Sequence, residues 1–467
     1  MLGEPSNPFD VTIIGAGISG LSLAYYLQRF APHLSLTLLE GSGRAGGVIA
    51  THREQGCLID QGPDSFITAK PYARDLCKDL GLAQDLIAFG KNSKPLWMVK
   101  NGKLAALPEG LYLGLPKNHW QFLANGTLPL TMKLRMGLDF FHRKMHRAQD
   151  VSLGNFLRDH FGKQSIDWMF NPILGGIYAS SVDALSTQAT FPQFLALEKQ
   201  YGSLIRGLRA QPIAPSGPSA GSPFLSLRNG MGQLIDTLQH TLAASSLQFN
   251  HQVSHLAFNP ANQIYTVTVG AQNKTIQTRH LVLALPPSRA KEITANIPHA
   301  SKWFDAFSAS STAVVFLGFE KKQIGNTLPG LGFLVPRKEN FKTLAATFVS
   351  NKFEGRSPDD IFLLRTFFGG HNRENVLELH DSDLSQLALK EVQQILGFHS
   401  PPLFTKIFRY HQQSPLYGVG HLDQVAHFES NLKKQPRFHY LSNALYGVGI
   451  PDCIRKAKEL AEQISKT

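Results

Sequence analysis

A glycine-rich bend near the start of the chain constrains the fold more than any other feature. Residues 9–14 (FDVTII) form a largely apolar run, which is typical of a strand buried on both faces. Residues 15–20 (GAGISG) follow directly, and apolar side chains then recur at helical spacing up to residue 30. A second apolar run, residues 34–40, completes a strand, a helix and a strand within about 30 residues. Such a crossover implies parallel strand pairing and predicts an α/β fold.

The glycines of this bend have the spacing of a dinucleotide-binding loop. Gly15 would permit a tight turn, Gly17 would leave room for a pyrophosphate, and Gly20 would let the helix pack closely on the strand. Glu40, at the end of the second strand, would accept hydrogen bonds from ribose hydroxyls. The alternative is a turn that binds no phosphate, with a solvated Glu40. Because N–H groups at a helix N-terminus bind phosphates, the candidate contacts of the bend are Gly15, Ala16, Gly17, Ile18, Ser19 and Gly20.

A second glycine-rich bend, residues 41–47 (GSGRAGG), follows Glu40 directly. A nicotinamide site needs no such bend. It is similar to a loop of flavin-dependent amine oxidases and desaturases, in which an arginine helps to hold the FAD pyrophosphate. Residues 62–65 are similar to the turn that those enzymes place beside the flavin, and a flexible turn is the alternative for residues 41–47. The resemblance makes FAD the expected cofactor, with candidate contacts at Gly41, Arg44, Gly46, Gly47, Val48, Gly62, Pro63, Asp64 and Ser65.

Composition argues against several other classes of protein. The formal net charge of +12 favours anionic partners, but the basic residues are scattered, so we expect no nucleic-acid partner. Cys57, Cys77 and Cys453 lie far apart and form no CxxC pair, so we expect neither a disulfide framework nor a metal site. No apolar run approaches the length of about 18 residues that indicates a membrane-spanning helix.

Longer segments extend the resemblance over nearly the whole chain. They are residues 161–180 (FGKQSIDWMFNPILGGIYAS), 191–208 (FPQFLALEKQYGSLIRGL), 226–238 (SLRNGMGQLIDTL), 334–338 (LVPRK), 365–374 (RTFFGGHNRE), 414–421 (SPLYGVGH) and 441–454 (LSNALYGVGIPDCI). On these segments the chain resembles the family of protoporphyrinogen and coproporphyrinogen oxidases, FAD enzymes of porphyrin synthesis.

The resemblance implies an enzyme with a porphyrinogen substrate. Its expected reaction is the six-electron oxidation of protoporphyrinogen IX to protoporphyrin IX in haem biosynthesis, with FAD as hydride acceptor and molecular oxygen as final acceptor. Coproporphyrinogen III, which carries two more carboxylates, is the alternative substrate. A flavin amine oxidase or a carotenoid desaturase would share the glycine bends but not residues 191–208 or 365–374. A non-catalytic flavin-binding protein also stays open.

The resemblance further assigns cofactor contacts outside the glycine bends. Val253 would contact the adenine through its backbone. Gly449, Ile450 and Pro451 would lie near the isoalloxazine ring, at the start of a last helix whose apolar stripe continues to Ile464. The N–H groups of that helix would point at an electron-rich part of the flavin.

Five positions are the candidates for substrate binding. By resemblance, Leu334 and Phe367 match apolar positions that sandwich the tetrapyrrole, and Gly176 matches a glycine near the substrate. Arg365 would share a strand face with Phe367, because strands have a period of two, and would pair with a propionate; a surface ion pair is the alternative. Lys100 stands where plant enzymes of this family have an arginine, and a lysine keeps the charge without the bidentate fork.

We predict an α/β (α+β) fold with three parts. A Rossmann-like FAD domain would be built from the discontinuous residues 1–90, 224–295 and 405–467. A substrate-binding domain with a mixed sheet would comprise residues 91–104, 170–223 and 296–404. Its short strands without long intervening helices favour a mixed or an antiparallel sheet. Residues 105–169 would form a helical membrane-binding subdomain, by resemblance to the family.

Within that subdomain, residues 130–147 predict a basic amphipathic helix. Lys133 to Arg147 would contact an anionic membrane surface, and His142 and His146 would share one helix face. A purely soluble helical cap is the alternative. We therefore expect a cytoplasmic protein that associates peripherally with the inner face of the cell membrane. A homodimer is compatible with the sequence, which does not otherwise indicate an oligomeric state.

Overall fold

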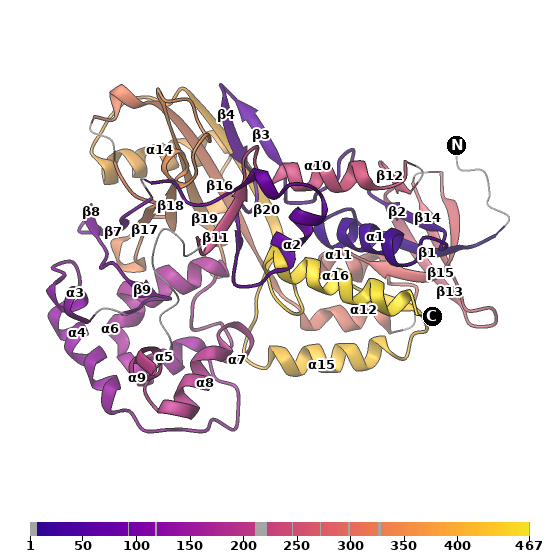
Figure 1. Ribbon diagram of the computed structural model, residues 1–467, viewed down its shortest axis with the longest axis horizontal. Coiled ribbons are helices and arrows are strands. Elements are labelled where there is room, and N and C mark those ends of the chain that lie inside the picture. Colours follow the sequence, from indigo (N-terminus) through magenta and orange to yellow (C-terminus); the bar gives the residue numbers. More distant parts are fainter. Residues whose placement is uncertain are drawn as a thin grey trace.

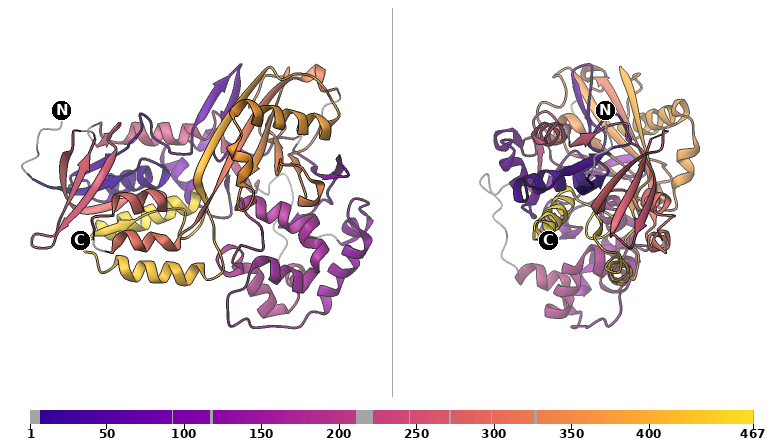
Figure 2. Two further views of the ribbon diagram at one scale, coloured as in Figure 1. Left: turned by 180° about the vertical axis from the view of Figure 1, so that it is seen from behind. Right: turned by 90° about the vertical axis from the view of Figure 1, so that its right-hand side faces the viewer.

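The computed structural model describes residues 7–91, 93–116, 119–210, 222–244, 246–270, 272–297, 299–325 and 328–466. Two seven-stranded sheets, three smaller sheets and one helical lobe make up most of this part of the chain (Figure 1). The first sheet contains the first strand of the chain, and the last helix packs against it. Viewed from behind, the helical lobe lies below the second sheet (Figure 2). Most of the sequence between residues 210 and 223 lies outside the described residues.

The first sheet has the strand order β12-β2-β1-β15-β14-β13, with β21 pairing to β15. The predicted unit is confirmed, because β1 (Phe9–Ile14), α1 (Ile18–Phe30) and β2 (Leu36–Leu39) follow in turn and β1 pairs with β2 in parallel. The other strands are β12 (Leu247–Gln248), β13 (Val253–Asn259), β14 (Ile264–Val269), β15 (Lys274–Leu283) and β21 (Phe438–Tyr440).

Helices cover both faces of this sheet, as buried strands of an α/β fold require. One face packs against α1, α2 (Tyr72–Asp79), α10 (Gly232–Thr241) and α16 (Ile450–Ile464). The other packs against α11 (Pro287–Ile293), α12 (Ala300–Trp303) and α15 (His421–Leu432). Helix α16 lies alongside α1, so the last segment of the chain returns to the first glycine bend (Figure 1).

The second sheet has the order β20-β16-β19-β18-β17-β7-β8 and is mixed, as predicted, because β17 pairs with β7 in parallel while its other pairs are antiparallel. Its strands are β7 (Leu96–Lys100), β8 (Lys103–Ala106), β16 (Ala309–Glu320), β17 (Gly332–Leu334), β18 (Ala345–Phe348), β19 (Ile361–Gly369) and β20 (Phe404–Pro415). Helix α14 (Asp381–Leu396) packs on one face. Alternate residues of β19 divide between the faces, since Phe362 and Leu364 pack with α14 while Leu363 and Phe367 pack on the opposite side.

Short elements connect the sheets and complete the helical lobe. Between the sheets lie β3 (Thr51–Glu54), β4 (Cys57–Asp60), β5 (Phe66–Ile67), β6 (Leu86–Ile87), β11 (Phe224–Leu227) and α13 (Val349–Lys352). The lobe comprises β9 (Leu111–Tyr112), β10 (Leu115–Pro116), α3 (His119–Ala124), α4 (Leu130–Gly137), α5 (Leu153–Phe161), α6 (Lys163–Ser165), the π-helix η3 (Ile166–Gly175), α7 (Thr187–Thr190), α8 (Pro192–Tyr201) and α9 (Leu204–Ala210).

The predicted continuous helix over residues 130–147 is wrong. Helix α4 ends at Gly137, a 3-10 turn covers Leu138–Phe141, and the backbone is extended at His142, so His142 and His146 do not share a helix face. The cause is a buried polar contact. Asp139 is turned inward and accepts hydrogen bonds from the Ser203 hydroxyl at 2.7 Å and the Ile205 N–H at 2.9 Å.

Candidate active site

The two glycine bends lie against each other. Gly17 and Gly46 form an isolated parallel bridge, and the Gly46 N–H donates to the Ala16 carbonyl at 2.8 Å. Gly15 has φ +104° and Gly46 has φ +100°, a left-handed conformation that favours glycine. At Gly15 an added Cβ would lie 2.5 Å from the Ala284 carbonyl oxygen. The bends therefore depend on glycine for their backbone path.

Gly17 differs from its neighbours because it faces open space. A Cβ built on Gly17 would have no atom within 4 Å, whereas one on Gly20 would overlap the Gly15 carbonyl. Open backbone at the second glycine of this motif is what a pyrophosphate requires, and Gly17 is also the N-cap of α1. The local geometry therefore fits an FAD pyrophosphate.

Charged side chains brace the two bends. Glu40 accepts from the Ala16 N–H and from the Ser42 N–H, each at 2.9 Å, and so ties the end of β2 to the first bend. A carboxylate has further lone pairs, so Glu40 can still accept from a ribose hydroxyl. The Arg44 guanidinium donates to the Gly47 carbonyl at 2.6 Å. Sequence reasoning gave Glu40 and Arg44 ligand roles, and the structure adds that both hold the loop itself.

The remaining predicted cofactor residues lie after β2, at the start of β13 and at the start of the last helix. Val253 is buried at the start of β13, and the adjacent Gln252 lies next to Gly41 at the end of β2. Gly449 caps α16, whose first turn contains Ile450 and Pro451. Asp452 in the same turn is buried and pairs with Lys70 at 2.7 Å. The structure thus brings the first bend, the second bend and the last helix together, as the resemblance implied.

Tyr417 holds the segment that precedes this last helix. Its hydroxyl donates to the Asn443 carbonyl at 2.6 Å and accepts from the Gly447 N–H at 2.7 Å. Its ring stacks on His421 with 4.1 Å between centroids. His421 in turn lies within 3.1 Å of the Leu445 carbonyl. These contacts hold residues 443–447 in place. Sequence reasoning missed them because Tyr417 is distant from these residues in the sequence.

A cavity of about 620 Å³ opens where residues 62–65 and η3 of the helical lobe meet the second sheet. This volume is in the range of small-molecule sites, which run to about 1,000 Å³. One wall is the predicted flavin turn, residues 62–65, together with Val48, Asn443 and Val448. Residues of η3 and of β16, β17 and β19 form other parts of the lining. A ligand in the cavity would therefore lie beside the place predicted for the isoalloxazine ring.

Four of the five predicted substrate residues line this cavity. They are Gly176, Leu334, Arg365 and Phe367. Lys100 is not among the lining residues, because its amine turns toward the helical lobe and donates to the Thr127 carbonyl at 2.7 Å. Its amine also lies 5.7 Å from the centre of the Trp168 ring. A substrate contact of Lys100 stays a prediction.

Arg365 is buried, so the alternative of a surface ion pair is wrong. Its guanidinium donates to the Gly62 carbonyl at 2.8 Å and to the Gln61 carbonyl at 3.2 Å, and it lies 4.7 Å from the centre of the Phe367 ring. The shared strand face predicted for Arg365 and Phe367 is present. Burial lowers the pKa of Arg365, and Asp64 opposes that effect. Arg365 thus clamps the flavin turn to the second sheet.

Lys352 was not predicted as a site residue. Its amine lies 2.8 Å from both carboxylate oxygens of Asp64. Burial by itself raises the pKa of Asp64, but Lys352 and Arg365 outweigh it and lower that pKa to about 2. Asp64 is the one carboxylate among the described residues that line the cavity, and it is ionised at neutral pH. The turn beside the flavin therefore carries a compensated ion pair.

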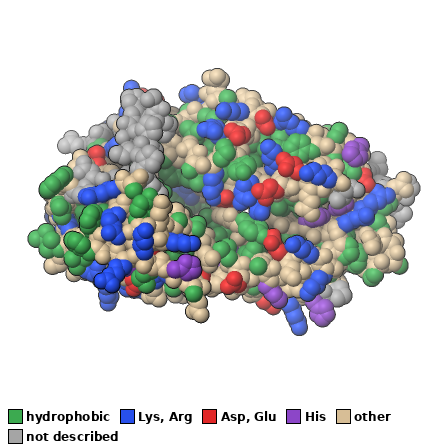
Figure 3. Space-filling model, turned by 60° about the horizontal axis from the view of Figure 1, so that its bottom comes forward, with side chains coloured by type: hydrophobic (Ala, Val, Ile, Leu, Met, Phe, Trp, Pro, Cys, Tyr) green, Lys and Arg blue, Asp and Glu red, His purple; other side chains and the backbone are tan. Residues whose placement is uncertain are grey.

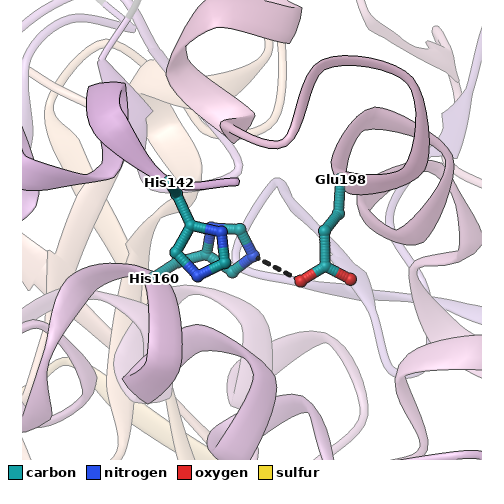
Figure 4. A group of neighbouring side chains, drawn as sticks. All are labelled: His142, His160 and Glu198. Atoms are coloured by element: carbon teal, nitrogen blue, oxygen red, sulfur yellow. Dashed lines mark hydrogen bonds and ion pairs between the residues drawn. The ribbon is translucent and has the colours of Figure 1, made fainter. Parts of the chain in front are cut away.

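His142, His160 and Glu198 lie close together in the helical lobe (Figure 4). The two imidazole rings stack with 4.2 Å between centroids. His160 has Asp139 at 2.5 Å on Nδ1 and Glu198 at 3.1 Å on Nε2, and Arg147 lies 2.9 Å from the same Glu198 oxygen. Burial lowers the pKa of His160, but the hydrogen bonds to Asp139 and Glu198 outweigh burial and raise that pKa above its ordinary value. His160 and its carboxylate partners therefore form an ion-pair cluster.

Comparison with known proteins identifies the class. The family model described as flavin containing amine oxidoreductase matches residues 18–465. The chain belongs to this family. Coproporphyrinogen III oxidase of Bacillus subtilis is 30% identical over 96% of this chain and 96% of its own length. Protoporphyrinogen oxidase 2 of Arabidopsis thaliana is 27% identical over 97% of this chain and 93% of its own.

A solved structure extends the match to three dimensions. A crystal structure from Exiguobacterium sp. 255-15, provisionally named protoporphyrinogen oxidase, has 30% identity and a TM-score of 0.87, covering 99% of this chain and 100% of that one. As a flavin amine oxidoreductase, the protein is an FAD-dependent oxidoreductase, which confirms the predicted cofactor. In the described part of the chain, no helix combines the length and the apolar character needed to cross a bilayer.

Proposed function

We propose that this flavin amine oxidoreductase oxidises a porphyrinogen to the corresponding porphyrin, with molecular oxygen as the final electron acceptor. The observation that carries the proposal is the cavity between the flavin turn and the second sheet. Its lining includes apolar side chains such as Leu334 and Phe367 and basic side chains such as Arg337 and Arg373. A flat, carboxylate-bearing ring matches that combination. The names of the relatives from Bacillus and Arabidopsis support the same substrate class.

FAD, when bound, supplies a two-electron acceptor, and oxidation of a porphyrinogen removes six electrons in total. The protein's own residues have other tasks. Leu334 and Phe367 orient the macrocycle against the flavin turn, and the apolar side chains of the lining limit the access of water to the reacting bridge carbon. The pair of Asp64 and Lys352 keeps the local charge balanced beside the flavin.

Two substrates fit this proposal. Protoporphyrinogen IX is the substrate expected from the resemblance of the sequence. Coproporphyrinogen III is the second candidate, and one observation favours it. The Bacillus relative, at 30% identity over nearly the whole chain, bears its name.

Aerobic turnover tests this proposal. The purified holoenzyme is mixed with protoporphyrinogen IX or coproporphyrinogen III, and porphyrin fluorescence is followed against a control without enzyme. Formation of either porphyrin at a rate above the control supports the proposal, and the ratio of kcat/KM values identifies the substrate. Oxidation of simple amines without oxidation of either porphyrinogen would contradict it.

We also propose that the helical lobe docks on an anionic membrane surface. Residues between 120 and 145 carry many exposed apolar side chains, among them Trp120, 83% exposed, and Phe141, 78% exposed. They gather at one end of the molecule beside basic side chains (Figure 3). We name the set of Trp120, Leu123, Leu130, Leu134, Leu138, Phe141 and Met145 the apolar face. Apolar area flanked by cations is typical of interfacial binding.

The basic residues of this lobe divide into two groups. Lys133, predicted to contact lipid headgroups, is buried and donates to the Leu123 carbonyl at 2.9 Å. Arg147, also predicted to face lipid, pairs with Glu198 at 2.9 Å. Arg143 and Lys144 are exposed beside the apolar face and take the headgroup role in this proposal. Peripheral attachment to the inner face of the cell membrane, the division into three domains and a homodimer stay predictions.

A further inference from the structure

The basic residues of the cavity fall into two groups that differ in how their charge is compensated. At the flavin end, Lys352 has Asp64 at 2.8 Å. Arg365 at the same end gives two of its N–H groups to the carbonyls of Gln61 and Gly62. The charges of Lys352 and Arg365 are therefore already paired with groups of the protein. Within the described residues, Arg337 and Arg373 lack a carboxylate partner.

Arg337 and Arg373 also line the cavity, and they have no anionic partner in the described part of the chain. Arg337 begins the 3-10 turn Arg337–Glu339 and is exposed, and the half-buried Arg373 caps the turn Glu374–Glu378. Within the ranges that the structure describes, neither forms an ion pair. Arg373 instead donates to the Phe341 carbonyl at 2.6 Å, which fixes it beside the turn that carries Arg337.

The carboxylate that raises the pKa of Arg373 is Glu391, and the Glu391 oxygens are already used. They accept from the Lys342 N–H and the Thr343 N–H, each at 2.8 Å. Burial and the charge of Arg337 lower the pKa of Arg373, while Glu391 raises it. Arg337 and Arg373 thus line one cavity, lie near enough for their charges to interact, and have no ion-pair partner in the described part of the chain. Two such guanidinium groups suit an external anion.

Chain connectivity shows what kind of anion fits. On β17, Leu334 lines the cavity and Arg337 follows three residues later; on β19, Phe367 lines it and Arg373 follows after a double-glycine turn. Each strand thus supplies an apolar wall residue and then a guanidinium farther out. A ligand that lies flat on Leu334 and Phe367 would direct its edge toward both arginines.

Resting on the porphyrinogen function proposed above, we propose that Arg337 and Arg373 bind the propionates of two adjacent pyrrole rings and so fix which edge of the macrocycle points away from the flavin turn. Guanidinium groups suit planar carboxylates because they donate two parallel hydrogen bonds. Both candidate substrates have two such neighbouring propionates. The pair is therefore a positioning and specificity site that both would use.

Binding of product analogues tests this assignment without turnover. Protoporphyrin IX and its dimethyl ester are titrated into the FAD-loaded wild type, Arg337→Gln and Arg373→Gln, with porphyrin fluorescence as the readout. We expect each variant to bind the diacid at least tenfold more weakly and to bind the ester as the wild type does. Lys342→Gln, an exposed cation outside the cavity wall, serves as the matched control and should change neither affinity.

Other outcomes separate the two proposals. Equal weakening of diacid and ester in the variants would show that the arginines only maintain the fold, and unchanged binding of the diacid would also overturn the assignment. If the wild type binds neither porphyrin and turns over neither porphyrinogen, the proposed function itself fails. If the wild type oxidises a porphyrinogen but the variants still prefer the diacid over the ester as strongly as the wild type does, only the assignment of Arg337 and Arg373 is contradicted.

Discussion

At the scale of single residues, Arg365 connects the two halves of the site. It donates from β19 to carbonyls of the flavin turn, and Tyr410 donates to the same Gln61 carbonyl at 2.7 Å. Its Nε atom is buried without a protein partner, so one donor stays free on a side chain that lines the cavity. The residue that sequence reasoning assigned to the substrate therefore also holds the cofactor turn in place.

Replacement of Arg365 tests this clamp. Arg365→Met removes two hydrogen bonds from buried carbonyls, and we expect a loss of about 3 kcal/mol in the free energy of unfolding, together with lower FAD content. Arg365→Lys keeps the charge but not the planar fork of the guanidinium. Its unfolding free energy and FAD content should lie between those of Arg365→Met and the wild type. Denaturant titration and flavin absorbance measure both effects. Wild-type stability and full flavin content in Arg365→Met would contradict the clamp.

His160 gives a second prediction at this scale, because its folded pKa lies above its ordinary value. The stabilisation from its charged form is complete below about pH 6.5 and is lost as pH rises through the folded pKa. His160→Gln leaves Asp139 and Glu198 without their shared partner and should cost about 3–5 kcal/mol at low pH.

The difference in unfolding free energy between wild type and His160→Gln should therefore shrink as pH increases above about 6.5. Thermal or denaturant unfolding over a pH series measures it, with the exposed His33→Gln as the control. A difference that is independent of pH, or that grows with pH, would show that His160 is neutral in the folded protein.

At the scale of elements, the sequence predicted what neighbouring residues determine. Strand β1, helix α1, strand β2 and helix α16 appear where apolar periodicity and the glycine bends placed them. The helix predicted over residues 130–147 was too long, because the end of α4 depends on Asp139. This residue accepts hydrogen bonds from Ser203 and Ile205, more than sixty residues later in the chain. No periodicity within one segment can report such a contact.

The same reason explains which site residues were missed. Arg337 and Arg373 stand in two separate segments, and only the pairing of β17 with β18 and of β18 with β19 brings them to one cavity. A signal existed in the sequence, because each strand with an apolar cavity residue is followed shortly by an arginine. Its meaning depended on the order of strands, which local patterns do not give.

The segment held by Tyr417 gives a prediction at the scale of elements. Tyr417→Phe keeps the ring stacked on His421 but leaves the Gly447 N–H and the Asn443 carbonyl without a partner. We expect FAD affinity to fall about tenfold, as for a loss of about 1–2 kcal/mol. Titration of FAD into the apoprotein measures it, with Tyr201→Phe in the helical lobe as control. Unchanged FAD affinity would show that the segment needs no support from Tyr417.

At the scale of the whole molecule, the cavity and the apolar face belong to adjoining parts of one structure. Helix η3 lines the cavity and packs in the core of the lobe that carries the apolar face. A poorly soluble macrocycle that travels through a bilayer would therefore have a short path to the site. This arrangement links the proposed substrate to the proposed membrane contact.

Vesicle flotation tests the membrane contact. We expect the protein to float with vesicles that contain anionic lipid, less so at high salt, and to lose most of this binding in the double variant Leu134→Ser, Phe141→Ser. Leu403→Ser, an exposed apolar residue next to β20, is the control. Failure to float with either anionic or neutral vesicles would contradict docking by the apolar face.

The most direct test of the central claim, that FAD and a porphyrinogen meet in this cavity, is anaerobic mixing of the purified holoenzyme with each porphyrinogen. We expect the flavin absorbance to bleach on mixing, and porphyrin fluorescence to build up over repeated turnover once oxygen is admitted. A flavin that stays oxidised with both porphyrinogens, in a protein with full FAD content, would contradict the claim.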